Sequence, residues 1–207
     1  MKLYYSPLSP FVRKARVAAF ELGLADQIEL VPITVAPGRP NADYAKDTNP
    51  LRKIPALIRD DGSVLYDSGV ICEYLDAQAG GGRLLPDGEA RWTVLRDHAL
   101  ATGLCDAAVL IRYETWLRPE EYRWDGWTED QWDKVNNGLT WFEGNPDDCG
   151  DAGATTLNLA QITLGCLLGY LDLRFGDRNW RGDCPGLSAW YERVSQRASF
   201  KETVPLE

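Results

Sequence analysis

Apolar and polar positions at the start of the chain predict a short strand followed by a helix. Residues 2–5 (KLYY) form an apolar run that two Ser-Pro pairs bring to an end. Ser9 suits the cap of the following helix, Pro10 its first turn and Gly23 its end. Helical spacing places four apolar side chains on one face of that helix. They are Val12, Ala15, Ala19 and Leu22.

A second strand and a long polar link come next. Residues 28–33 (IELVPI) alternate weakly between polar and apolar, as in a half-buried strand. Pro32 cannot donate to a sheet, so it places this strand at an edge or ends it. Residues 37–49 are rich in Pro, Gly and Asn, which predicts a loop with a short helix near residues 43–46.

A hairpin and a second helix complete the first part of the chain. The apolar runs 54–58 (IPALI) and 63–66 (SVLY) flank Asp61-Gly62, which favours a tight turn between two strands. A helix is expected over residues 69–78. One crossover and one hairpin together predict a mixed four-stranded sheet in an α/β domain.

The rest of the chain has a helical pattern. Residues 79–88 (AGGGRLLPDG) have the composition of a linker. Helices are then expected over residues 89–117, 128–143, 159–175 and 187–197. We therefore expect an α/β domain over residues 1–78, a linker over 79–88 and an all-α domain over 89–207.

Composition and charge narrow the class of protein. The 207 residues are 44% hydrophobic and 26% charged, which is typical of a soluble globular protein. The net charge of −9 disfavours nucleic acid as a partner. No apolar run approaches the ~20 residues of a membrane span, and the first residues lack the apolar core of a signal peptide. We expect a cytoplasmic protein that binds neither membrane nor nucleic acid.

The excess of acidic over basic residues lies after residue 80. Residues 1–80 hold nine Lys or Arg and ten Asp or Glu, whereas the remainder holds thirteen and twenty-one. An anionic ligand would meet less repulsion in the first part, where five cations stand near the candidate motifs. They are Arg13, Lys14, Arg16, Arg52 and Lys53. Solvated surface charge explains each of them equally well.

The cysteines and the one histidine carry no recognisable metal or redox motif. The cysteines are odd in number, scattered and free of any C-x-x-C pair, which argues against a disulfide framework, a zinc site or a dithiol motif. They are Cys72, Cys105, Cys149, Cys166 and Cys184. His98 lies inside a predicted helix, so a packed or solvated imidazole is expected rather than a catalytic triad. We expect no metal.

Pro55 stands inside an apolar, strand-like run, where it cannot donate to a ladder. One explanation is a bulge or a strand start. Another is a cis peptide after Ile54, which costs only ~0.5–1 kcal/mol at an X-Pro bond. A cis turn would leave the backbone N–H and C=O of Ile54 free for an extended ligand.

Asp67-Ser68 precedes the helix at 69–78 and suits two uses. Either residue can cap the helix. Alternatively, the hydroxyl and the free N–H groups hold a ligand carboxylate while Asp67 binds an ammonium group. Together with Ile54, the pair would form a receptor for an amino-acid-like ligand.

Three stretches of the first part resemble cytosolic glutathione S-transferases of the serine/cysteine type found in bacteria. They are SPLSPFVRK at 6–14, NPLRKIPAL at 49–57 and LYDSGVICEYL at 65–75. The likeness continues in LGCLLGYLDLRF at 164–175 and in residues 190–200. The resemblance implies a thioredoxin-like domain with a cis-proline that binds glutathione, followed by a helical domain that shapes a co-substrate pocket. It also implies a homodimer.

The resemblance implies roles at matching positions of the glutathione site. Ile54, next to Pro55, would pair its backbone with the cysteinyl part of the tripeptide. Asp67 and Ser68 would hold the γ-glutamyl end, and Lys53 would approach the glycyl carboxylate.

Ser9 matches the position that faces the glutathione sulfur, which makes it the catalytic candidate. Tyr4 or Tyr5 is the alternative, because other classes use a tyrosine, but both lie inside the predicted strand. The co-substrate pocket would include Phe11, Tyr113 and Trp116. Further aromatic candidates for its wall are Tyr122, Trp124 and Trp127, although most tryptophans are expected in the core.

One stretch departs from the family pattern. The family commonly begins its long core helix with Ser or Thr followed by Ala-Asp, whereas this chain has Asn158-Leu-Ala-Gln161. Asn with Gln three positions later still forms a capping box, without the carboxylate charge.

The leading functional hypothesis is transfer of glutathione to a small hydrophobic electrophile. Glutathione-dependent reduction of a disulfide or peroxide is the first alternative, and a cysteine at position 9 would favour it. A non-catalytic glutathione-binding protein of the same fold is the second.

Overall fold

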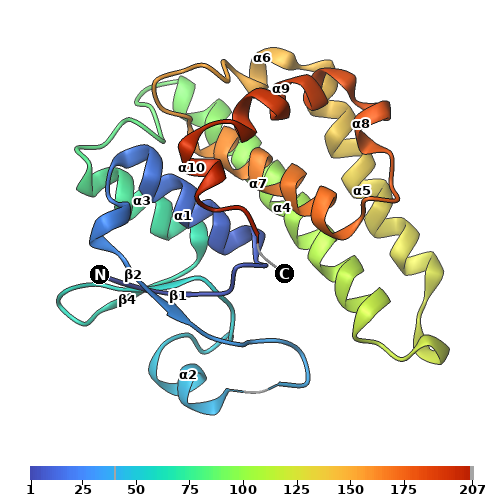
Figure 1. Cartoon of the computed structure of the whole chain (residues 1–207), viewed down its shortest axis with the longest axis horizontal. Helices are drawn as coiled ribbons and strands as arrows, with labels where there is room; N and C mark the ends of the chain where they lie inside the picture. Colours follow the sequence, from blue (N-terminus) through green and yellow to red (C-terminus); the bar gives the residue numbers. More distant parts are fainter. Residues whose placement is uncertain (40, 206–207) are drawn as a thin grey trace.

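The computed structural model describes residues 1–39 and 41–205 and contains one mixed sheet (Figure 1). Its strands are β1 (Lys2–Tyr5), β2 (Glu29–Pro32), β3 (Ala56–Ile58) and β4 (Val64–Leu65). Their order is β2-β1-β3-β4, with β1 parallel to β2, β1 antiparallel to β3, and β3 antiparallel to β4. The predicted four-stranded mixed sheet is confirmed, with Pro32 on an edge strand.

Helices α1 and α3 pack against each other beside this sheet, and α2 lies beyond its other side (Figure 1). The helical elements of the first part are α1 (Pro10–Leu22), the 3-10 turn η1 (Ala25–Gln27), α2 (Ala42–Asp47) and α3 (Ser68–Gln78). The four apolar side chains expected on the inner face of α1 are all buried. This arrangement is the predicted thioredoxin-like domain.

Local chemistry sets the ends of these elements. The Ser9 hydroxyl accepts a hydrogen bond from the Val12 N–H at 3.3 Å, and Gly23 ends α1 in the left-handed region with φ 73°. The Ile54–Pro55 peptide is cis, as expected, and β3 begins only after it. The strand therefore starts two residues later than its apolar run, because Pro55 has no N–H to donate.

The connection between α3 and α4 is anchored rather than free. The buried Asp76 carboxylate accepts hydrogen bonds from the N–H groups of Arg83, Leu84 and Leu85 at 3.0–3.3 Å. Leu84 is fully buried, and its carbonyl accepts from the Leu159 N–H at 3.0 Å. The glycine-rich composition predicts a linker, but these contacts fix its second half against both domains.

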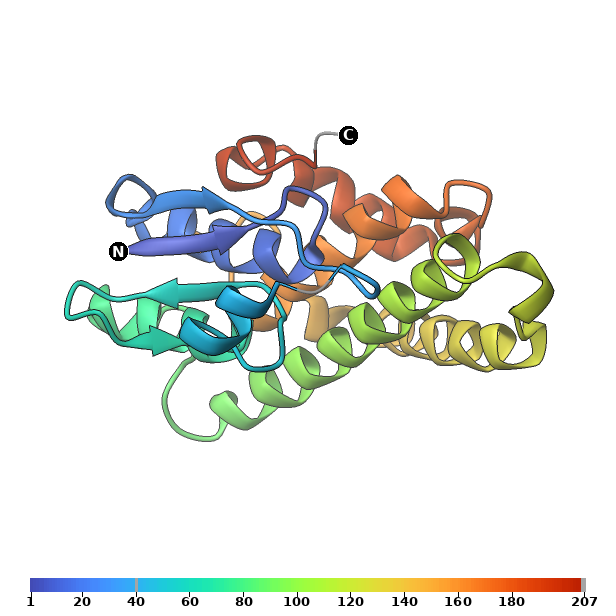
Figure 2. The same cartoon turned by 90° about the horizontal axis from the view of Figure 1, so that it is seen from below.

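The second part of the chain is helical throughout. Its elements are α4 (Ala90–Trp116), η2 (Glu120–Tyr122), α5 (Asp125–Gly144), α6 (Pro146–Cys149), α7 (Leu159–Arg174), α8 (Trp180–Asp183), α9 (Pro185–Ser195) and α10 (Ala198–Lys201). The four long helices match the predicted ones, whereas the short elements are too brief for a periodic signal. Figure 2 shows the length of α4, which runs from the α/β domain to the far end of the molecule.

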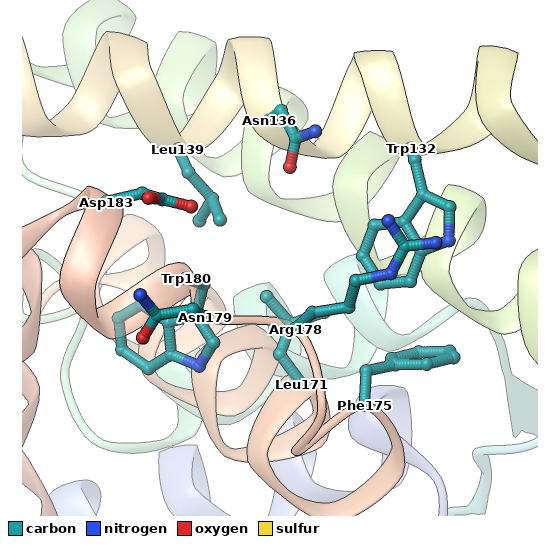
Figure 3. A pocket seen from close by; sticks show the side chains of 9 residues that line it. All are labelled: Trp132, Asn136, Leu139, Leu171, Phe175, Arg178, Asn179, Trp180 and Asp183. Atoms are coloured by element: carbon teal, nitrogen blue, oxygen red, sulfur yellow. The ribbon is translucent and has the colours of Figure 1, made fainter.

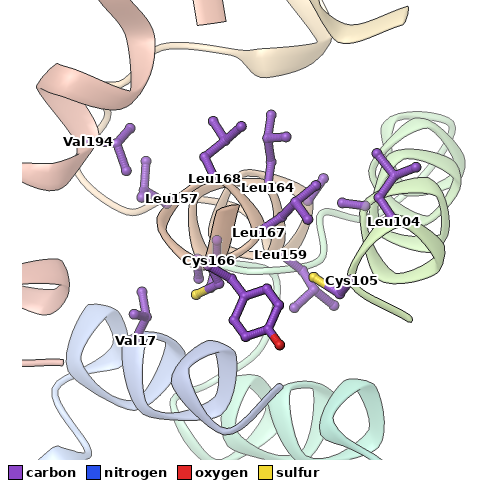
Figure 4. Packing of buried hydrophobic residues seen from close by; sticks show 14 of the residues in the cluster. Val17, Leu104, Cys105, Leu157, Leu159, Leu164, Cys166, Leu167, Leu168 and Val194 are labelled. Carbon is purple, nitrogen blue, oxygen red and sulfur yellow. The ribbon is translucent and has the colours of Figure 1, made fainter. Parts of the chain in front are cut away.

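Helix α7 is the centre of the helical domain. It is buried on all sides from Leu159 to Leu171, as a helix that is apolar all round should be. Figure 4 looks along it, with α4 on one side and α1 and α3 below. The predicted capping box is present, because Asn158 and Gln161 each accept a hydrogen bond from the other's N–H, at 2.9 and 2.8 Å.

The last residues return to the first domain (Figure 1). Helix α10 packs on α1, and the buried Arg13 guanidinium donates to the Phe200 carbonyl at 3.2 Å and to the Thr203 hydroxyl at 3.4 Å. Together with the contact between α1 and α7, these bonds join the two domains along one helix.

Candidate functional site

Three segments of the α/β domain meet at one edge of the sheet. Because β1 and β3 are antiparallel, the segment after β1 lies beside the start of β3. The end of β4 lies at the same edge, because β3 and β4 are also antiparallel. This edge therefore brings together Ser9, Ile54 and Asp67, which the sequence predicts as parts of one site.

Ser9 stands at the N-terminus of α1 and is half-buried. Its hydroxyl oxygen accepts the capping hydrogen bond from Val12, so the hydroxyl hydrogen remains available to donate. An anion placed here would also meet the positive end of the α1 dipole. The local geometry allows Ser9 to cap the helix and to contact a ligand at once.

Two side-chain hydrogen bonds hold the loop before β3 in place. The Lys53 carbonyl accepts two hydrogen bonds, from the Tyr44 hydroxyl at 2.8 Å and from the Asn49 side-chain amide at 2.9 Å. The Lys53 side chain is exposed. Within the described ranges 1–39 and 41–205, neither the N–H nor the C=O of Ile54 has a backbone partner. The site thus presents one free donor and one free acceptor at a rigid turn.

Asp67 and Ser68 differ in their accessibility. One oxygen of the exposed Asp67 carboxylate, Oδ1, caps α3 by accepting from the N–H groups of Gly69 at 2.9 Å and Val70 at 3.4 Å. The other oxygen, Oδ2, accepts no hydrogen bond from the residues that the structure describes. Ser68 is only 2% exposed. Asp67 is therefore the accessible member of the predicted pair.

Helix α4 supplies residues that the sequence does not indicate as functional. The Thr163 hydroxyl donates to the Leu159 carbonyl at 2.7 Å. His98 Nδ1 lies 2.9 Å from the Thr163 hydroxyl oxygen and is therefore assigned as the donor to it. The opposite nitrogen, Nε2, is then unprotonated, and it lies 3.2 Å from where a Cβ on Gly69 would be. Burial and the Lys14 charge lower the pKa of His98 to about 4, so the imidazole is neutral. His98 is packed, as expected, but it also contacts the start of α3.

Asp106 lies two turns beyond His98 on the same side of α4. Burial raises the pKa of its carboxyl, and the charges of Lys53 and Lys14 oppose that rise. Its side chain is nevertheless partly exposed to solvent, so a ligand can reach it. The spacing between His98 and Asp106 fits one side of a helix. The sequence alone does not indicate which face of α4 packs against α3.

The predicted aromatic pocket residues are spread along the molecule. Phe11 is half-buried against the core near the start of α1. Tyr113 is half-buried on α4, about 10 Å beyond Asp106 at ~1.5 Å per residue. Trp116 is 55% exposed, lies under the Arg112 guanidinium, and stands about 27 Å beyond His98. Tyr113 is therefore closer than Trp116 to the edge that carries Ser9.

The remaining aromatic candidates, Tyr122, Trp124 and Trp127, lie at the same far end, where α4 turns into α5. Tyr122 and Trp124 are exposed, and Trp127 is half-buried.

The rings of the two alternative tyrosines pack against other side chains. The Tyr4 ring packs edge-on against Tyr44 with 5.2 Å between centroids. The Tyr5 ring lies 5.9 Å from the Arg16 guanidinium. Both residues belong to β1, as the sequence predicts, so Ser9 is the hydroxyl at the start of α1.

The cationic cluster divides into buried and exposed members. Surface solvation is the wrong interpretation for Arg13 and Lys14, because both are buried. Arg52 and Lys53 are exposed beside the loop before β3, and Arg52 has a positive φ of 53°. Arg16 is half-buried and donates to the Glu202 carbonyl, so Arg52 and Lys53 are the exposed members of the cluster.

The cavity in Figure 3 is separate from this edge. It has a volume of about 100 Å³ and lies between α5, α7 and α8. Its lining is Trp132, Asn136, Leu139, Leu171, Phe175, Arg178, Asn179, Trp180 and Asp183. None of the residues predicted for the site lines it.

In the described part of the chain, no cluster of three or more His, Cys, Asp or Glu side chains is placed to hold a metal ion. No helix there has the length and apolar character needed to cross a membrane. All five cysteines are buried free thiols.

Comparison with known proteins matches both parts of the chain. Residues 8–78 match the family described as glutathione S-transferase, N-terminal domain, and residues 125–193 match glutathione S-transferase, C-terminal domain. The GST-like protein YibF of Escherichia coli K12 is 34% identical over 208 residues, covering 99% of this chain and 98% of that protein.

Two crystal structures of a glutathione transferase family member from Pseudomonas fluorescens Pf-5 are also similar. The one with bound glutathione has a TM-score of 0.92 and 43% identity, covering 100% of this chain and 99% of that one. The one with bound S-(propanoic acid)-glutathione has a TM-score of 0.89 and 41% identity, covering 100% of both chains.

Proposed function

This chain belongs to the glutathione S-transferase family, and we propose that it conjugates glutathione, through its thiolate sulfur, to small hydrophobic electrophiles. The observation that carries the proposal is the meeting of Ser9, Ile54 and Asp67 at one edge of the sheet. Similar proteins that hold glutathione and an S-substituted glutathione support it.

Each part of the tripeptide has a complementary group at this edge. The free backbone groups of Ile54 suit the cysteinyl residue, as in a strand pair. The second Asp67 oxygen suits the γ-glutamyl ammonium, and the exposed Lys53 suits the glycyl carboxylate. The cysteinyl sulfur then falls near Ser9.

Ser9 would stabilise the thiolate form of the sulfur. A helix dipole contributes up to ~2 kcal/mol, and a hydrogen bond to a charged group ~1.5–3 kcal/mol. A reduction of the thiol pKa by about two units is therefore within reach, at ~1.36 kcal/mol per unit. From a free-thiol pKa of ~8.5, the thiolate fraction at pH 7 rises roughly 25-fold.

Activation of the sulfur is not enough by itself. The same pKa reduction makes the thiolate about eightfold less nucleophilic, at a Brønsted slope of ~0.45, so the net gain is only a few-fold. Holding an electrophile against the sulfur contributes far more to the rate. We assign this task to Phe11 and Tyr113, with Trp116 at the outer end of the same face of α4.

The serine at position 9 also separates this function from reduction. A hydroxyl cannot form the mixed disulfide that a cysteine would form with a substrate. We therefore place conjugation ahead of disulfide or peroxide reduction. A homodimer in the cytoplasm, as the family resemblance implies, is part of the proposal, and a solution mass measurement tests the dimer.

The test has a binding arm and an activity arm. Calorimetry should detect binding of glutathione and of S-methylglutathione. Conjugation of an aryl halide, followed by absorbance, should then exceed reduction of a glutathione mixed disulfide. Binding of neither tripeptide at millimolar concentration would refute the glutathione site. Binding without conjugation would indicate a non-catalytic protein, and dominant reduction would identify a reductase.

A further inference from the structure

Lys14 is a buried cation whose ammonium group has no hydrogen-bond partner among the described residues. Its side chain is 1% exposed, although it belongs to one of the residue types least often fully buried. In the part of the chain that the structure describes, no acceptor lies within hydrogen-bonding distance of its ammonium nitrogen, Nζ. A buried, unpaired charge is costly to the folded state, so its presence calls for an explanation.

The ammonium group lies where the two domains meet. Its charge acts on titratable side chains of the neighbouring helices α3, α4 and α7, and two of these, Cys105 and Cys166, are visible in Figure 4. The full set is Cys72, His98, Cys105, Asp106 and Cys166. The one carboxylate among them, Asp106, is partly exposed to solvent and makes no ion pair with Lys14.

The Lys14 side chain extends toward the start of α1. Side chains on a helix lean toward its N-terminus, and Nζ accordingly lies 5.9 Å from the ring centroid of Phe11, one turn earlier. Phe11 in turn stands two residues after Ser9. The positive charge is therefore held close to the first turn of α1, under an apolar ring that shields it from water.

We propose that Lys14 is a positioning residue whose buried ammonium stabilises the thiolate of glutathione bound at Ser9. This inference rests on the proposed function. At an effective dielectric constant of ~20, a unit charge about 10 Å away lowers a thiol pKa by roughly one unit. The buried thiols respond in the same direction, because the Lys14 charge opposes the rise in pKa that burial causes.

Lys14→Met tests the charge and keeps most of the side-chain volume. The pKa of bound glutathione, measured from the ultraviolet absorbance of the thiolate, should rise by about one unit. The pH profile of conjugation should shift upward by the same amount, so that the rate recovers at high pH. Thermal stability should hold or increase, because a buried unpaired charge is removed. Lys14→Arg should leave the thiol pKa within about a third of a unit of the wild-type value.

Arg16→Gln provides the matched control on the same helix. The Arg16 guanidinium donates to the Glu202 carbonyl, on the side of α1 that faces the C-terminal residues. Its loss should move the thiol pKa by less than a third of a unit. A Lys14→Met protein with an unchanged thiol pKa, or with conjugation reduced equally at every pH, would overturn the proposal.

S-methylglutathione separates this inference from the proposed function. It has no ionisable thiol, so Lys14→Met should bind it as tightly as the wild type does. If the wild type binds neither tripeptide, the proposed function fails and this inference fails with it. If Lys14→Met does not fold, Lys14→Gln carries the same test. Folding of Lys14→Arg but of neither uncharged variant would assign the charge to folding and overturn the proposal.

Discussion

The Arg197 guanidinium lies against the Glu21 carboxylate, 176 positions earlier in the chain, with 2.5 Å between Nη2 and Oε2. The Ser199 hydroxyl and the Leu157 N–H donate to the same carboxylate, at 2.5 and 3.2 Å. The side chain of Glu21 is 5% exposed and that of Arg197 is 19% exposed. This ion pair fastens the end of α1 to the segment before α10.

Removing one partner of this pair should destabilise the whole molecule. Arg197→Met leaves the Glu21 carboxylate buried without its main partner, which typically costs about 3–5 kcal/mol. We expect chemical denaturation to show a loss of this size. Lys134→Met is the control, because the Lys134–Asp130 pair is exposed on both sides and should contribute less than about 1 kcal/mol. Equal effects of the two substitutions would contradict the prediction.

The same carboxylate should contribute to the loss of stability in acid. Burial favours a higher pKa for Glu21, but hydrogen bonds from Arg197, Ser199 and the Leu157 N–H outweigh it, and the pKa is lowered. A lowered folded-state pKa stabilises the protein above the unfolded value of about 4.5, and this contribution is lost as the pH falls through the folded-state value.

His98 should produce a separate pH dependence at milder acidity. Its pKa is about 4 in the folded protein, against 6.5 for the free side chain. The unfolded chain therefore binds a proton that the folded one does not, so stability should fall as the pH drops from 6.5 toward 4. The full contribution is roughly 3 kcal/mol, of which roughly 2 kcal/mol should be lost between pH 7 and pH 5. Denaturation at these two pH values measures that loss.

His98→Asn supplies the comparison, since its amide can still donate to Thr163 and does not titrate. The difference in stability between pH 7 and pH 5 should be smaller in this variant than in the wild type. An identical difference would show that His98 is not the group responsible.

Elements whose ends depend on a few adjacent residues could be predicted from the sequence. The Ser9 and Asn158 caps, and Gly62 with φ 83° between β3 and β4, follow from local backbone chemistry. The Asp76 anchor and the Glu21–Arg197 pair could not, because each depends on a partner placed by the tertiary fold. The limits of the two domains remain a prediction.

The candidate site also has parts that the sequence predicts and parts that depend on tertiary packing. Ser9 and Asp67 follow the ends of β1 and β4, and Ile54 precedes β3, so the strand order and directions bring them together. The roles assigned to them remain predictions. The contact of His98 with Gly69 and the burial of Lys14 depend on how α3, α4 and α7 pack, and no spacing in the sequence carries that information.

Asp67→Asn should separate capping from ligand binding. Asn caps helices about as well as Asp, so stability should change by less than about 1 kcal/mol. The charge that would pair with the γ-glutamyl ammonium is lost, which should weaken glutathione binding by roughly 1.5–3 kcal/mol, or about 10- to 150-fold. Calorimetry gives the affinity and thermal unfolding the stability. Unchanged affinity would show that Asp67 only caps α3.

Tyr113 and Trp116 should differ in their effect on the electrophile. Tyr113 is half-buried nearer to Asp106, whereas Trp116 is exposed at the far end of α4. Tyr113→Ala should raise the KM for a small aryl electrophile several-fold, and Trp116→Ala should change it less than twofold. The KM for glutathione serves as the internal control, since both variants should retain it. The reverse order of effects would place the pocket farther out along α4.

Ser9→Ala tests the contact with the sulfur directly. Loss of the cap should cost about 1 kcal/mol of stability. Loss of the hydrogen bond to the thiolate should raise the pKa of bound glutathione by one to two units, at ~1.5–3 kcal/mol. Conjugation near neutral pH should fall accordingly, while binding of S-methylglutathione stays the same. Ser9→Cys is the informative companion, because a thiol at this position would permit a mixed disulfide and should raise reductase activity. If Ser9→Ala lowers only the Tm, Ser9 is a helix cap and the sulfur is stabilised by other groups.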